Sequence, residues 1–165
     1  MINISRVLAW GGAALVVVSG MGSAQTTETT STQYQSWTVN CTQEADQRQC
    51  AMSQSLNLQN QSGLLLRVEL QRNAEGAASG IVVVPFGLDI TKGISLSIDG
   101  GPRWNIPMRT CQNFGCVVPL TLGPGIVDQM KQSSTVQISL YTLDGGQTLE
   151  VPVSLAGFTA AFDAL

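Results

Sequence analysis

Residues 109–118 read Arg-Thr-Cys-Gln-Asn-Phe-Gly-Cys-Val-Val, and this stretch decides the fold class. Cys111 and Cys116 bracket four residues, of which Asn113 and Gly115 are types that tolerate the backbone angles of tight turns. Apolar residues that favour β-structure follow at once. The stretch therefore predicts a turn that is closed by a short disulfide and leads into a strand. It also indicates an oxidising compartment, an all-β chain and a second cysteine pair elsewhere.

The chain has four cysteines, which allow three ways of forming two disulfides. We favour the local pairing, Cys41 with Cys50 and Cys111 with Cys116, because each pair flanks a turn-like segment. Short loops of this kind contribute about 2–3 kcal/mol per disulfide. A zinc site is the alternative, but the C-x8-C and C-x4-C spacings suit zinc poorly and the chain has no histidine. We therefore expect neither a metal nor a cofactor.

Residues 1–24 have the pattern of a secretory signal peptide. Arg6 precedes an apolar run over residues 7–20, and Gly22-Ser23-Ala24 supplies small residues for cleavage. The run of about 15 residues is shorter than the roughly 20 that a membrane-spanning helix needs, which disfavours the alternative of a retained anchor. We therefore expect cleavage after Ala24, export, and a mature chain that begins at Gln25 and has no transmembrane helix.

The expected mature chain divides into a short leader and one domain. Residues 25–33 are rich in threonine and contain no apolar side chain, which predicts a flexible leader. Residues 34–165 are expected to form a single disulfide-stapled β domain of a common size. Without residues 1–24 the chain carries seven basic and eleven acidic side chains, a net charge of −4. This charge argues against binding to nucleic acid or electrostatic docking on anionic lipid.

Apolar residues alternate with polar ones at a regular spacing through most of this domain. The pattern predicts about eight to nine short antiparallel strands in a β-sandwich or an irregular barrel. Residues 42–49 are expected to form a solvated connection, and residues 124–131 and the C-terminal 158–165 to be helical. Pro107 and Pro119 place their strands at sheet edges. The expected strands are 37–41, 50–56, 64–70, 80–85, 94–98, 103–110, 116–122, 136–141 and 149–155.

The sequence lacks the residues of the common nucleophilic enzymes. There is no histidine, so a Ser-His or Cys-His pair is excluded. A Ser-x-x-Lys dyad is excluded as well, because the residue three positions before each lysine is an aspartate, Asp89 or Asp128, and not a serine. Three carboxylates are candidates for an acid pair of the glycosidase type, but their places on polar strand faces or in a turn favour surface roles. They are Glu69, Asp99 and Glu150. We therefore expect no enzymatic activity.

The aromatic residues offer one candidate for recognition. Trp37 and Trp104 lie in strand patterns and are expected to pack in the core. Phe114 lies at the tip of the turn between two cysteines, with Asn113 before it. Because exposed loops on a rigid scaffold often carry binding, Asn113 and Phe114 form the candidate recognition loop.

Several short motifs occur in a fixed order along the chain. They are Tyr-Gln-Ser-Trp at 34–37, Cys41, Gln-Cys-Ala-Met at 49–52, Pro-Phe-Gly-Leu at 85–88, Gly-Ile-Ser-Leu-Ser-Ile-Asp-Gly at 93–100, the cysteine turn at 109–117, and the ending 151–165. As an ordered set they resemble the invasion-associated locus B (IalB) family of exported bacterial proteins. The chain departs from that pattern in having Tyr34 where the family often has phenylalanine, and Asn40 where it commonly has a basic residue.

The resemblance implies an exported cell-envelope protein of α-proteobacterial type, located in the periplasm, at the outer membrane or outside the cell. The family's best-known member is associated with invasion of host erythrocytes. The resemblance thus implies a non-enzymatic binding or host-interaction factor, associated with virulence, whose partner is a protein or glycan on a host cell surface. The alternative is a periplasmic structural or stress-related housekeeping protein with no host role.

Overall fold

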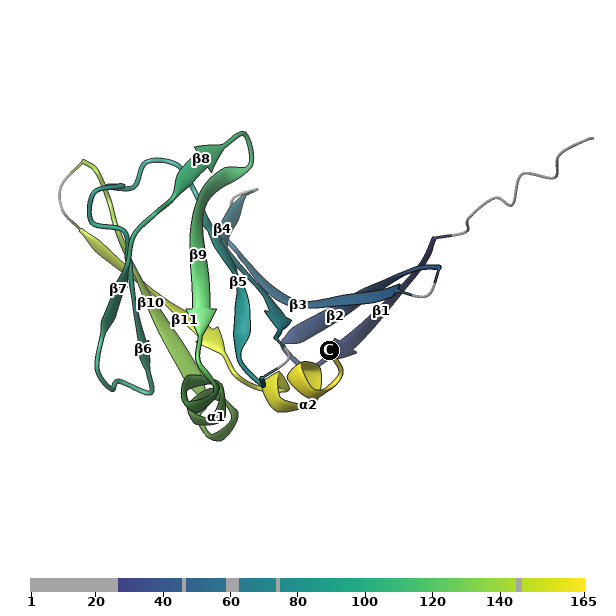
Figure 1. The fold of residues 1–165 in the computed structure, drawn as a ribbon. Coiled ribbons are helices and arrows are strands. Elements are labelled where there is room, and N and C mark those ends of the chain that lie inside the picture. Colours follow the sequence, from purple (N-terminus) through teal and green to yellow (C-terminus); the bar gives the residue numbers. More distant parts are fainter. Residues whose placement is uncertain (1–26, 46, 59–62, 74, 145–146) are drawn as a thin grey trace, which may run out of the picture.

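The structure is a computed structural model that describes residues 27–45, 47–58, 63–73, 75–144 and 147–165. Within these ranges it contains eleven strands and two α-helices (Figure 1). The signal peptide expected over residues 1–24 lies outside them. In chain order the elements are β1 (Glu28–Tyr34), β2 (Trp37–Glu44), β3 (Gln47–Asn57), β4 (Leu64–Arg72), β5 (Ala78–Val84), β6 (Ile94–Ile98), β7 (Trp104–Ile106), β8 (Thr110–Gln112), β9 (Gly115–Leu122), α1 (Pro124–Gln132), β10 (Thr135–Tyr141), β11 (Thr148–Ser154) and α2 (Phe158–Asp163).

The strands form two antiparallel sheets that face each other. The larger sheet has the order β1-β2-β3-β4-β5-β9-β8, and the smaller sheet has the order β11-β10-β6-β7. Alternate side chains turn inward, so that Val68 and Leu70 of the larger sheet and Ile138 and Val153 of the smaller sheet line one interior space. The all-β class and the two-sheet architecture expected from the alternation are confirmed. The Ile-Val-Val-Val run of β5 lies between β4 and β9, inside the larger sheet.

The C-terminal helix α2 packs against β1 and β2, the first two strands of the described residues. Figure 1 shows β1, β2 and β3 extending away from the smaller sheet, with α2 near their base. Trp37 of β2 is fully buried, and its ring meets Phe158 edge-on at 5.4 Å between ring centroids. Lys131 of α1 binds Asp163 of α2 at 2.7 Å, which ties the two helices together. Both expected helical segments are therefore present.

The flexible leader expected over residues 25–33 is wrong from Glu28 onward. β1 pairs with β2 in continuous register from Glu28 opposite Gln43 to Tyr34 opposite Trp37. Its side chains are exposed apart from Tyr34, which is half-buried. The strand is held by backbone hydrogen bonds to its neighbour, and its β-branched threonines suit an extended backbone without needing a core. Because such an edge strand is polar on both faces, its sequence has no alternation of apolar and polar residues from which a strand could be predicted.

Residues 42–49, expected to form a solvated connection, are solvated, since their described side chains are exposed except for half-buried Gln43, but they are not a connection. β2 and β3 continue as a paired hairpin beyond the disulfide, as far as Glu44 opposite Gln47. Cys41 and Cys50 are direct register partners in this hairpin and are bonded to each other. The disulfide therefore joins neighbouring strands within the sheet.

The segment expected as one strand over residues 103–110 is two strands in different sheets. β7 is the last strand of the smaller sheet, β8 is the last strand of the larger sheet, and Pro107 lies between them. Both lie at sheet edges, as the proline indicates. Pro119 obeys the same rule, because β8 pairs with β9 only over residues 115–117 and leaves the rest of that side of β9 as an edge. β1 and the division of residues 103–110 into β7 and β8 raise the number of strands from the expected nine to eleven in the described residues.

Candidate functional site

Three connections meet at one end of the sandwich, the end opposite α1. Val84 pairs with Cys116, which brings the segment after β5 beside the β8–β9 turn. The amide of Leu143 in the β10–β11 connection donates to the carbonyl oxygen of Gly87 at 3.0 Å. Leu88 and Thr142 form a further bridge between the same two connections. The three connections are therefore linked by backbone contacts, and their described residues lie toward the top of the view in Figure 1.

This end carries the most exposed large apolar side chains of the described residues. Phe86 is 61% exposed, Ile90 58%, Phe114 55% and Leu143 72%. Exposed apolar side chains that gather in one region of a folded protein often mark an interaction site. We call Phe86, Ile90, Phe114 and Leu143 the apolar loop end.

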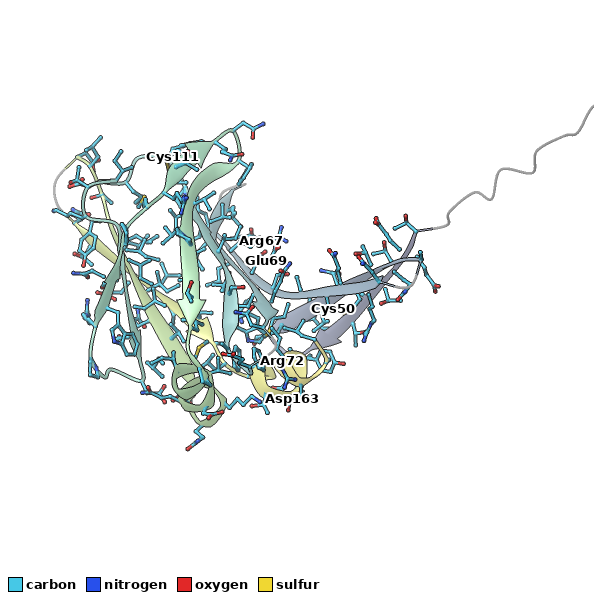
Figure 2. The ribbon with its side chains drawn as sticks, viewed as in Figure 1. Cys50, Arg67, Glu69, Arg72, Cys111 and Asp163 are labelled. Carbon is cyan, nitrogen blue, oxygen red and sulfur yellow. A yellow bond between two sulfur atoms is a disulfide. The ribbon has the colours of Figure 1, made fainter. Side chains whose placement is uncertain are left out.

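The β8–β9 turn holds Phe114 on a fixed backbone. Cys111 and Cys116 are direct register partners and are joined by a disulfide, with Cys111 visible at this end in Figure 2. Gly115 has φ of +136°, and a Cβ there would lie 2.6 Å from the carbonyl oxygen of Val84. Only glycine lets the turn lie this close to β5. The candidate loop of Asn113 and Phe114 is thus a short, cross-linked turn whose tip faces solvent.

Hydrogen bonds to the carboxylate of Asp89 order the connection that carries Phe86 and Ile90. The Asp89 carboxylate accepts hydrogen bonds from the hydroxyl of Thr91 at 2.6 Å and from its amide at 3.0 Å. The Thr91 hydroxyl is the main cause that holds the pKa of Asp89 below its usual value, with help from the Lys92 charge. Asp89 is therefore ionised at neutral pH and can keep this loop in one conformation.

The three carboxylates considered for acid–base chemistry are not brought together. Glu69 of β4 and Glu150 of β11 lie in different sheets. Glu69 points outward, because its strand neighbours Val68 and Leu70 line the interior, and Figure 2 labels it beside Arg67. Each has its own partner: Glu69 binds Arg67 at 2.8 Å, Glu150 binds Arg103 at 3.2 Å, and Asp99 accepts from the amide of Thr135 at 2.9 Å. Within the described ranges no three His, Cys, Asp or Glu residues are placed to hold a metal ion.

The comparison with family models gives a clear result. The model described as Invasion associated locus B (IalB) protein matches residues 37–165. The chain belongs to the IalB family. The resemblance carried by the ordered motifs is thereby confirmed.

Curated relatives and a solved structure agree with membership of the IalB family. The chain is 33% identical over 144 residues to an invasion protein B homologue of Brucella abortus, covering 87% of this chain and 82% of that protein. It is 30% identical over 147 residues to invasion protein B of Bartonella bacilliformis, covering 87% and 76%. The crystal structure of invasion associated protein B from Bartonella henselae superposes with a TM-score of 0.75 at 25% identity, covering 82% of this chain and 93% of that one. These relatives are named as invasion proteins and not as enzymes. In the part of this IalB-family chain that the structure describes, neither helix has the length and hydropathy of a membrane span.

The sequence pattern singles out one of the four residues of the apolar loop end, Phe114, through the cysteines on either side of it. Phe86, Ile90 and Leu143 lie outside the expected strands and helices, and the sequence pattern assigns them no role. The available signal was an apolar residue inside a turn-forming stretch, such as Leu143 before Asp144-Gly145-Gly146. Trp104, expected in the core, is instead 36% exposed, because β7 is the outermost strand of the smaller sheet.

Proposed function

We propose that this IalB-family protein is an exported, non-enzymatic binding protein of the cell envelope that contacts a protein or glycan on a host cell surface. The observation that carries the proposal is the apolar loop end, where the most exposed large apolar side chains of the described residues gather on tied and cross-linked loops. Ordered loops lose less conformational entropy on binding than mobile ones, which favours recognition there. The names of the relatives as invasion proteins support a host-directed role.

Export is supported by the disulfides, which form and persist in oxidising compartments. We expect mass spectrometry of the protein from its native cells to show a chain that starts at Gln25, after removal of residues 1–24. Protease treatment of intact cells then separates a surface location from a periplasmic one. An uncleaved Met1 terminus on membrane-embedded protein contradicts export by a cleaved signal peptide.

The apolar loop end can be tested with Phe114→Ala. A minority of interface residues dominates binding, and truncating one of them costs more than about 1 kcal/mol. If Phe114 is such an anchor, the affinity should fall at least about fivefold. The free energy of unfolding should change by no more than about 0.5 kcal/mol, because the ring is mostly exposed. The measurement is binding of labelled mature protein to erythrocytes and to a nucleated cell line, together with thermal unfolding.

Gln129→Ala on α1 is the matched control, because it removes an exposed side chain at the opposite end of the sandwich. It should leave cell binding unchanged. If Phe114→Ala lowers stability strongly and leaves binding intact, the turn is architectural and the proposed site is wrong. If wild-type protein binds neither cell type and the periplasm holds all of it, the housekeeping role replaces the host-directed one.

A further inference from the structure

A large apolar cavity lies between the two sheets, away from the apolar loop end. Its volume is about 290 Å³, and its walls are Val68, Leu70 and Val82 on one side and Ile138 and Val153 on the other. Voids in protein interiors rarely exceed the size of a water molecule, so a space of this volume is far outside ordinary packing defects. It approaches the range of about 300–1,000 Å³ in which small-molecule sites occur.

The cavity opens to solvent along one side of the sandwich. Most of its lining residues are buried, but Trp104 and Thr121 are exposed, and Ile106 and Ile126 are half-buried. These four residues come from β7, β9 and α1, where the last strand of the smaller sheet faces the free edge of β9. They therefore form the mouth of the cavity, and α1 contributes Ile126 to it.

The chemistry of the walls selects the class of ligand. Apart from the indole nitrogens of the two tryptophans, the hydroxyl of Thr121 is the one side-chain N–H or O–H group among the described lining residues, and Thr121 lies at the mouth. Water needs two to four polar partners to occupy a cavity, so it is poorly suited to this one. A charged group would lose its hydration inside without gaining a partner. The enclosed part of a ligand is therefore apolar, and any polar head stays outside, next to the amphipathic ring of Trp104.

We propose that this cavity binds one aliphatic chain, from a fatty acid or a lipid, inserted past Trp104. The walls are mainly branched aliphatic side chains, which suit a flexible alkyl chain better than a flat ring system. An apolar cavity of about 150 Å³ admits the six carbons of benzene. By proportion, 290 Å³ accommodates about twelve carbons of a single chain. The proposal goes beyond the proposed function and concerns a separate part of the molecule.

The test is a calorimetric titration of purified, lipid-free mature protein with alkanoic acids of eight, ten, twelve and sixteen carbons, which measures the affinity for each acid. Affinity should rise about fourfold for each added methylene, as expected for burial of apolar surface, and level off beyond about twelve carbons. Dodecanol should bind like dodecanoate, since the head stays in solvent. The proposal is overturned if the affinity does not change with the length of the alkyl chain, or if the folded protein binds none of the acids. Binding to phosphatidylethanolamine vesicles without binding to the free acid or alcohol also overturns it, because a membrane surface is then the ligand.

Substitutions at the cavity test whether the alkyl chain binds there. Val153→Phe fills the cavity from the smaller sheet and should weaken dodecanoate binding at least tenfold. If that variant does not fold, Ile126→Glu places a charge at the mouth on the half-buried face of α1 and should weaken dodecanol binding at least tenfold. Phe114→Ala is the matched control and should leave the alkyl affinity unchanged. Normal alkyl binding by a folded cavity variant contradicts the assignment. Phe114→Ala tests cell binding and Val153→Phe tests alkyl binding. The two proposals can therefore fail independently of each other.

Discussion

Replacement of Trp37 by alanine is expected to lower the free energy of unfolding by about 3–5 kcal/mol, as truncation of a large buried aromatic does. Trp37 is fully buried and packs edge-on against Phe158, and its indole nitrogen donates to the carbonyl oxygen of Ser154 at 3.0 Å. One side chain thereby connects β2, the end of β11 and α2. Its ring also lines the interior cavity, so truncation enlarges a space that the surrounding sheets cannot close, which places the loss toward the upper part of the range.

Urea unfolding of the mature protein measures this loss, with an unchanged denaturant slope showing that the unfolded state is the same. Trp37→Phe is the matched control, because it keeps an aromatic ring and removes the indole donor. The Ser154 carbonyl oxygen still accepts from the Gln54 side chain at 2.8 Å, so no acceptor is left bare. We expect the control to cost about half as much as the alanine variant. A loss below about 1 kcal/mol for Trp37→Ala would mean that α2 docks independently of this ring.

The strands of the core were predictable because their side chains must face two different environments. Val136, Ile138 and Leu140 alternate with polar residues and form β10, opposite Ile98, Leu96 and Ile94 of β6. Alternation reports which face is buried, but it does not report which sheet a strand joins. The division of residues 103–110 between two sheets therefore followed only from the structure. β1 was missed for a related reason, since a strand exposed on both faces carries no apolar period.

The candidate site was predictable only where the sequence itself supplied a local constraint. Phe114 lies between bonded cysteines, and the turn can be inferred from residues within a few positions of it. Phe86 and Leu143 lie 57 residues apart in the numbering and meet at one end through the Gly87–Leu143 hydrogen bond. The cavity also depends on residues from both sheets and from α1, whose mutual placement no single segment encodes. Local chemistry can be read from sequence, whereas sites assembled by strand register cannot.

The two disulfides cross-link different parts of the same sheet. Cys41–Cys50 joins β2 to β3 in the extension that leads away from the smaller sheet, and Cys111–Cys116 joins β8 to β9 at the apolar loop end. Both connect direct register partners, so each restrains the unfolded chain and also holds one strand pair in register. The two bonds therefore offer matched variants that separate stability from recognition.

Loss of both disulfides is expected to lower the free energy of unfolding by about 4–6 kcal/mol, from about 2–3 kcal/mol for each short loop. The bonded residues are separated by nine positions in one case and by five in the other, so Cys41→Ala/Cys50→Ala should cost slightly more than Cys111→Ala/Cys116→Ala. Urea unfolding of each paired variant, and of wild type with and without reductant, measures these losses. Paired substitution matters, because Cys116→Ser alone leaves Cys111 as a free thiol that can mispair.

Cell binding separates the roles of the two bonds. Cys111→Ala/Cys116→Ala releases the turn that fixes Phe114, so binding must then supply the cost of ordering the turn, and affinity should fall at least fivefold. Cys41→Ala/Cys50→Ala should leave binding unchanged at temperatures where the variant remains folded, because its hairpin lies outside the apolar loop end. Equal losses of binding in the two variants, at equal folded fraction, would show that recognition does not depend on the Phe114 turn. Unchanged stability in reductant, with all four thiols shown free, would contradict the expected contribution of the disulfides.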